Sequence, residues 1–286
     1  MMKPLTVLQK YKARKTGLAL GGGGALGLAH VGVLKALETY DIFPSVVSGN
    51  SAGALVGGLY VSGKSVPELI DLSEELGTNM LDKIRMPLKG GVIKSRRIHE
   101  TLLDILGEKR IEDCDIPFYT ATVDLNSGKS YYIHRGRMAD AIFASICVPG
   151  VFQPFEANGL RLVDGGVRDT IPLRALKPHK LRLRIGVGIL KASLNNEFPE
   201  YLDISPGKEG EEENASPGGI LKVLSRSMSL MSTQSAFREI NASKPDLAIY
   251  IDLGQKMRVW QFDRHETAIK TGYEQARKQL KVFFGK

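Results

Sequence analysis

The chain has 286 residues, of which 43% are hydrophobic and 24% are charged, proportions typical of a globular protein with a substantial core. No apolar stretch is long enough to span a membrane, and the start of the chain lacks the uninterrupted apolar core of a signal peptide, so we expect a cytoplasmic protein. The net charge of +8 favours anionic partners. The basic segments are not interleaved with aromatic residues that could stack on bases, so we expect no nucleic acid partner.

Residues 1–15 form a basic tail. We expect this tail to be solvated, with peripheral docking to an anionic membrane surface as the alternative. Its positive charges are Lys3, Lys10, Lys12, Arg14 and Lys15.

Two strand–loop–helix units follow the tail. Thr16–Gly21 is an apolar run ending in glycines, which predicts a strand, and Ala25–Tyr40 carries apolar residues at helical spacing. Pro44–Ser48 predicts a second buried strand, and Ala52–Tyr60 predicts the helix after it. This order is typical of a mostly parallel sheet with helices on both faces, a three-layer α/β/α fold.

The rest of the chain continues this mixture of helices and strands. Residues 195–219 are rich in Gly, Pro, Ser and Glu and predict an exposed, mobile loop, with a lid or partner-binding segment as the alternative. We find no internal repeat and no domain boundary, so we expect one domain over residues 16–286. Helices are expected at Val66–Leu76, Ile98–Leu106, Ala139–Cys147, Ile220–Ile240 and Glu266–Phe284, and strands at Phe118–Asp124, Lys129–Ile133, Arg161–Val163, Leu183–Ile189 and Asp246–Leu253.

Ser51 lies between two glycines in Gly49-Asn50-Ser51-Ala52-Gly53, at the point where the second strand must become a helix. In a G-x-S-x-G elbow the serine sits on a tight, strained turn, and small neighbours leave its Oγ exposed to a substrate. The N-terminus of the following helix favours negative charge that develops there. The pattern and its context predict that Ser51 is a nucleophile, with Gly49 and Gly53 supporting the turn.

The run Gly21–Gly24 offers backbone amides for an oxyanion hole, because a chain without side chains can approach a substrate closely. The residues expected to contribute are Gly22, Gly23, Gly24 and Ala25. Dinucleotide binding is the alternative, since this run also fits G-x-G-x-x-G. That fingerprint requires an acid at the end of the second strand, whereas Asp41 precedes this strand.

The nucleophile also requires a proton acceptor. None of the five histidines (His30, His99, His134, His179 and His265) carries a motif. Asp164 ends an apolar strand and is followed by Gly165 and Gly166, which leave a carboxylate uncrowded. A carboxylate that touches the hydroxyl directly can act as the base. An ordinary turn aspartate is the alternative interpretation of Asp164.

At these residues the sequence resembles the patatin-like phospholipases, particularly their bacterial members. The resemblance rests on three motifs in order: the glycine-rich run from Gly17 to Leu37, Gly-Asn-Ser-Ala-Gly at Ser51, and Asp-Gly-Gly at Asp164. It implies a Ser51–Asp164 dyad that hydrolyses acyl esters of lipids through an acyl-enzyme, without a metal or another cofactor. The chain departs from the family pattern at Leu26, where a cation is common, and at Asn50, where threonine is common.

Two alternatives to this activity remain. One is a regulatory or adaptor protein on a hydrolase-like fold, suggested by Leu26 and the acidic stretch Glu211–Glu213. The other is an ordinary Ser–His–Asp hydrolase, which would bring an imidazole to Ser51. The sequence specifies neither the head group nor the oligomeric state.

Overall fold

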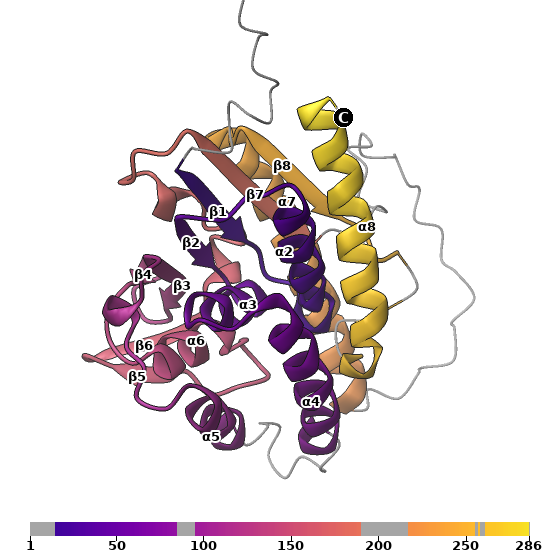
Figure 1. Cartoon of the computed structure of the whole chain (residues 1–286). Helices are drawn as coiled ribbons and strands as arrows, with labels where there is room; N and C mark the ends of the chain where they lie inside the picture. Colours follow the sequence, from indigo (N-terminus) through magenta and orange to yellow (C-terminus); the bar gives the residue numbers. More distant parts are fainter. Residues whose placement is uncertain (1–14, 85–94, 190–216, 255–256, 258–260, 286) are drawn as a thin grey trace, which may run out of the picture.

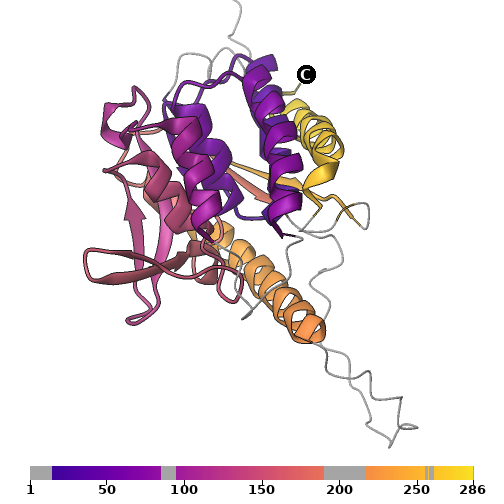
Figure 2. The same cartoon turned by 90° about the horizontal axis from the view of Figure 1, so that it is seen from below.

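A computed structural model of the protein describes residues 15–84, 95–189, 217–254, 257 and 261–285. Helices cover both faces of one central sheet in these residues (Figures 1 and 2). The strand order is β5-β6-β3-β2-β1-β7-β8, and β4 pairs with β3 outside this path. The strands are β1 (Thr16–Leu20), β2 (Val46–Gly49), β3 (Phe118–Asp124), β4 (Ser130–Ile133), β5 (Phe155–Ala157), β6 (Leu160–Asp164), β7 (Leu183–Ile189) and β8 (Leu247–Ile251).

The helices alternate with these strands along most of the chain, as the three-layer prediction requires. The α-helices are α2 (Ala29–Thr39), α3 (Ala52–Val61), α4 (Val66–Ile84), α5 (Ser95–Leu106), α6 (Met138–Ile146), α7 (Pro217–Ser243) and α8 (His265–Phe284). Short 3-10 helices are η1 (Gly24–Leu28), η2 (Ile111–Asp113), η3 (Gly165–Val167), η4 (Leu173–Leu176) and η5 (Phe262–Arg264).

The sheet is mostly parallel, which confirms the predicted fold class. Strands β3, β2, β1, β7 and β8 pair in parallel. The hairpin β3–β4 and the strands β5 and β6 add antiparallel pairs at one side. Strand β5 is absent from the sequence prediction because a three-residue strand carries almost no periodic pattern.

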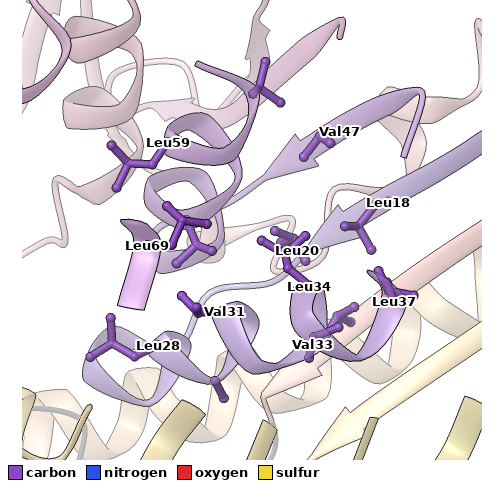
Figure 3. Packing of buried hydrophobic residues seen from close by; sticks show 14 of the residues in the cluster. Leu18, Leu20, Leu28, Val31, Val33, Leu34, Leu37, Val47, Leu59 and Leu69 are labelled. Carbon is purple, nitrogen blue, oxygen red and sulfur yellow. The ribbon is translucent and has the colours of Figure 1, made fainter. Parts of the chain in front are cut away.

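The side chains of the central strands alternate between two cores. Leu18 and Leu20 of β1 point into the larger core beneath α2, α3 and α8 (Figure 3), whereas Ala19 points to the other face. There the cover is η4 and α7, through residues such as Leu173 and Ile240. Figure 2 shows α7 on the opposite side of the sheet from α8.

The helix predicted after the first strand differs from the observed one. Instead of one helix from Ala25 to Tyr40, the chain makes the 3-10 turn η1 and then α2. Gly24 has a left-handed φ of 55°, so the chain leaves the glycine loop in a tight 3-10 turn before regular i→i+4 bonding begins. Helix α4 continues past its predicted end at Leu76 to Ile84, because one internal glycine is tolerated in a helix.

Some predictions concern residues outside the described part of the chain. These are residues 1–14 of the basic tail and residues 195–216 of the predicted loop, whereas residues 217–219 begin α7. Among the described helices, none has both the length and the apolar character needed to cross a bilayer.

Helices α2 and α8 cross at unusually close range because each has a glycine at the crossing. A Cβ placed on Gly32 would lie 2.0 Å from the carbonyl oxygen of Ile269, and a Cβ on Gly272 would lie 2.1 Å from that of Ala29. Backbone carbonyls cannot move aside as side-chain ends can. The two glycines therefore fix the position of α2, and with it the end of the glycine loop.

We expect Gly272→Ala to lower the free energy of unfolding by about 1–3 kcal/mol, because overpacking against backbone exceeds the gain of up to about 1 kcal/mol in helix propensity. Chemical denaturation would measure this, with Glu274→Ala on the exposed face of α8 as the control. Stability equal to or above that of the wild type would show that the helices separate without cost.

Candidate active site

Ser51 follows β2 and is the N-cap of α3. Its φ of 51° and ψ of −122° are a strained backbone conformation for a residue with a side chain. The flanking glycines are required by space, since a Cβ on Gly49 would lie 2.4 Å from the Gly53 carbonyl oxygen and one on Gly53 would lie 2.2 Å from that of Leu20. The strand–turn–helix context predicted for Ser51 is present.

The backbone of Ser51 is held by a residue that the sequence analysis missed. The amide of Ser51 donates a hydrogen bond of 3.0 Å to Ser145 Oγ, and this hydroxyl donates one of 2.8 Å to the carbonyl of Ala121. Ser145 is fully buried. The sequence did hold one signal for this role, since Ser145 is a lone hydroxyl in the apolar run of α6. A buried polar group of this kind requires a hydrogen-bond partner.

Asp164 is the last residue of β6 and is 6% exposed. Its Oδ1 accepts a hydrogen bond of 2.8 Å from the Gly166 amide. Burial raises the pKa of this carboxyl above its ordinary value, while hydrogen bonds from the Ser51 side chain, the Gly166 amide and the Asn50 side chain oppose the rise. The raised pKa makes the carboxylate a stronger base than an exposed aspartate.

Strand pairing explains how two residues so far apart in sequence meet. Thr120 and Thr122 of β3 both pair with β4 on one edge, so β2 and β6 share the other edge. Gly49 pairs with Thr120 in parallel and Asp164 pairs with Thr122 in antiparallel orientation. The carboxyl ends of β2 and β6 therefore face each other along β3, separated by two residues, or about 6.5 Å.

The glycine loop lies against the same point. A Cβ on Gly22 would lie 3.4 Å from Ser51 Cβ. The Gly22 amide donates a hydrogen bond of 3.1 Å to the Thr170 carbonyl and is therefore not free for an oxyanion, contrary to expectation. Among the described residues, the amides of Gly23, Gly24 and Ala25 have no acceptor. Of the predicted oxyanion donors, these three remain.

The segment after Asp164 ties the other two motifs together. It supplies the Thr170 carbonyl to the glycine loop and the Pro172 carbonyl to Ser48 Oγ on β2, at 2.8 Å. The three chain segments that carry the predicted motifs are thus joined by hydrogen bonds. Neither Thr170 nor Ser48 was predicted, since their positions matter only after the chain has folded.

The two departures from the family pattern occupy defined places. Leu26 is 5% exposed and belongs to the larger core, so it anchors the loop by burial. Asn50 is 1% exposed, and its amide packs against Gly22, Gly165 and Gly166, where a Cβ would lie between 2.7 and 3.0 Å from it. It touches the Asp164 carboxylate, but within the described residues neither polar atom completes a well-aligned hydrogen bond.

All five histidines are described, and none forms a hydrogen bond with Ser51. His30 contacts the Gly21 carbonyl, His99 pairs with Asp140, and His179 pairs with Tyr119. The geometry gives no support to a Ser–His–Asp arrangement. Strand β2 also ends without an acid, so the ribose contact of a dinucleotide site is missing in this part of the chain.

A second buried carboxylate lies five residues after Asp164. Asp169 accepts a hydrogen bond from the Tyr132 hydroxyl, and its other oxygen has no partner within the described residues. Burial raises the pKa of Asp169 to about 7; the negative charge of Glu239 adds to this, while the Tyr132 bond and Arg174 oppose it. Glu239 lies on α7 and forms an ion pair with Arg174 at 3.1 Å. The two acids, Asp169 and Glu239, therefore lie where α7 meets the segment after Asp164.

We expect Ser145→Ala to lower the free energy of unfolding by about 1–3 kcal/mol, because the buried Ser51 amide loses its acceptor and the Ala121 carbonyl loses a donor. Thermal and urea unfolding would measure this. The control is Ser130→Ala, at an exposed position on β4. Equal effects of the two substitutions would contradict the anchoring role of Ser145.

We expect Asp169→Asn to flatten the dependence of stability on pH. The folded-state pKa lies above the unfolded one, so the wild type loses stability as pH rises from about 4 to about 7. The free energy of unfolding of the variant should then exceed that of the wild type by on the order of 2 kcal/mol at pH 8. The difference should be smaller toward pH 4. Urea unfolding at several pH values would test this, and parallel curves would contradict it.

Comparison with known proteins identifies a family and several relatives. The family model described as patatin-like phospholipase matches residues 18–177. An uncharacterized NTE family protein of Mycobacterium tuberculosis is 30% identical over 234 residues, which are 80% of this chain and 59% of that relative. A protein named lysophospholipase nte1, from Emericella nidulans, is 32% identical over 169 residues, or 57% of this chain and 11% of the relative.

The fold agrees with a solved structure as well. The crystal structure of VipD from Legionella pneumophila is similar with a TM-score of 0.50 and 14% sequence identity, covering 94% of this chain and 67% of that one. This likeness concerns the fold alone. The segment matched by the family model, residues 18–177, makes up more than half of the sequence. It includes the glycine loop, the Ser51 elbow and the Asp164 strand. The chain therefore belongs to the patatin-like phospholipase family.

Proposed function

We propose that this protein is a serine hydrolase of lipid acyl esters, of the phospholipase A or lysophospholipase type, in which Ser51 is the nucleophile and Asp164 the base. The observation that carries the proposal is the buried contact between the Ser51 hydroxyl and the Asp164 carboxylate, beside glycine-loop amides that lack acceptors. A nucleophile, a base and unused donors at one point are what acyl transfer requires.

In the first step, Asp164 accepts the hydroxyl proton while Ser51 Oγ attacks the ester carbonyl carbon. The carbonyl oxygen becomes an oxyanion near the amides of Gly23, Gly24 and Ala25, which need no reorganisation to receive it. The N-terminal end of α3 adds a favourable dipole. The alcohol then leaves with the proton held by Asp164, and Ser51 carries the acyl group.

In the second step, Asp164 accepts a proton from water, whose oxygen attacks the acyl carbon. The bond to Ser51 Oγ breaks, the proton returns to Ser51, and the carboxylic acid is released. No group beyond the dyad and the amides is called for. The raised pKa of Asp164 suits this role, because a base is most effective when its pKa approaches the working pH.

Lipid substrates are the class that the family membership supports. The fungal relatives carry the name lysophospholipase, which makes a lysophospholipid the first substrate to test. The chain spans 59% of the length of the mycobacterial relative, so substrate range, peripheral membrane contact and cytoplasmic residence stay proposals for this chain. A catalytically silent adaptor is the competing proposal, and the same experiment decides between them.

We expect Ser51→Ala to abolish labelling by a fluorophosphonate probe and to reduce hydrolysis of a lysophospholipid and a p-nitrophenyl acyl ester by at least about 1,000-fold. Asp164→Asn should cost nearly as much, because the two residues act as a unit. It should not lower thermal stability, since it removes a carboxylate whose ionisation burial disfavours.

The controls are Ser130→Ala and Asp104→Asn, both at exposed positions, which should keep wild-type activity. If Ser51→Ala hydrolysed these esters at the wild-type rate, the mechanism would be excluded. A folded wild-type protein that neither reacts with the probe nor hydrolyses either ester would favour the adaptor.

A further inference from the structure

His30, the second residue of α2, is fully buried and holds one end of the glycine loop. Its Nε2 lies 2.7 Å from the carbonyl oxygen of Gly21. A carbonyl oxygen can only accept, so Nε2 carries the hydrogen and donates it. The other ring nitrogen, Nδ1, has no partner within the described residues.

The imidazole stays neutral in this place. Burial lowers the pKa of His30 to about 4, although the bond to the Gly21 carbonyl opposes the shift. At neutral pH the ring is therefore fixed as the tautomer with hydrogen on Nε2. A neutral donor can hold a carbonyl in the interior without bringing a charge close to the candidate site.

The peptide group between Gly21 and Gly22 is fastened on both sides. Its carbonyl accepts from His30 at 2.7 Å, and its amide donates to the Thr170 carbonyl at 3.1 Å. The next amides along the chain are those of Gly23 and Gly24, which have no acceptor among the described residues. The orientation of a peptide plane sets the direction from which the following residues continue.

His30 itself has little freedom to move. The preceding residue, Ala29, packs closely against Gly272 of α8. A Cβ on Gly272 would lie 2.1 Å from the carbonyl oxygen of Ala29. The rigid crossing of α2 and α8 thus fixes the donor, and the donor fixes the peptide. Without His30, the backbone torsions φ and ψ of the loop glycines would be less restricted, because glycine has no side chain and adopts positive and negative φ about equally.

We propose that His30 is a positioning residue, which aims the Gly23 and Gly24 amides at the oxyanion by holding the Gly21 carbonyl. The inference rests on the proposed function. His30 does not touch the substrate or the proton in transit. Its effect is on the stability of the transition state and not on substrate binding, because the loop amides are needed only when the oxyanion forms.

The test compares a variant that keeps the donor with variants that lose it. His30→Gln can present an amide N–H close to the position of Nε2, whereas His30→Leu and His30→Met cannot. The probes are kcat and KM on a p-nitrophenyl acyl ester, the rate of fluorophosphonate labelling at Ser51, and inhibition by an acyl trifluoromethyl ketone, which forms an oxyanion on the serine. His134→Leu, at an exposed position, is the control.

We expect His30→Leu and His30→Met to lower kcat by about 10- to 100-fold, as slight misplacement of a site does, with KM changed by less than about threefold. The labelling rate and the affinity for the trifluoromethyl ketone should fall in parallel with kcat. His30→Gln should recover most of the loss, and the control should match the wild type. Circular dichroism and thermal melts would confirm that each variant is folded.

Several outcomes would overturn the inference. Folded His30→Leu with wild-type kcat and ketone affinity would show that the loop holds its shape unaided. Failure of both apolar variants to fold, while His30→Gln folds, would make the role one of stability alone. A rise in KM with unchanged kcat would place His30 in substrate binding. Wild-type protein without activity would instead contradict the proposed function, and with it the inference.

Discussion

Two strands that run toward each other along one edge of β3 determine the architecture of the candidate site. Strand β2 is parallel to β3 and β6 is antiparallel to it, so their carboxyl ends meet where each delivers a functional side chain. Ser51 arrives from one direction and Asp164 from the other. If β6 ran parallel to β3 along this edge, its carboxyl end would instead point away from the end of β2. The antiparallel portion of the sheet therefore brings together the two residues of the proposed dyad.

The meeting point is buried, and burial has opposite effects on chemistry and stability. It raises the pKa of Asp164 and of Asp169, which strengthens the first as a base but makes ionisation of both unfavourable to folding. It also strengthens the hydrogen bonds that join the motifs, from Gly22 to Thr170 and from Ser48 to Pro172. The fold tolerates two costly carboxylates because neighbouring segments hold the site from several sides.

Close backbone packing explains the glycines of the three motifs in one physical way. At Gly21, Gly53 and Gly165, one in each motif, an added Cβ would lie less than 3 Å from backbone atoms of another segment. These glycines allow the elbow, the first strand and the strand of Asp164 to approach until their polar groups can interact. The crossing of α2 and α8 at Gly32 and Gly272 extends the same device away from the site, and it holds the helix that carries His30.

The sequence alone determined the fold class, the order of most elements and the three motifs, because apolar periodicity and glycine spacing are local properties. It could not show that the Gly22 amide donates a hydrogen bond to the Thr170 carbonyl, or that Ser145 accepts one from the Ser51 amide. Nor could it show that His30 contacts the carbonyl of Gly21 in the glycine loop. Each of these contacts joins residues whose proximity depends on strand order and helix crossing. Only the tertiary structure decides which polar groups meet in the interior, because most buried polar groups pair with whichever partner the folded chain brings within reach.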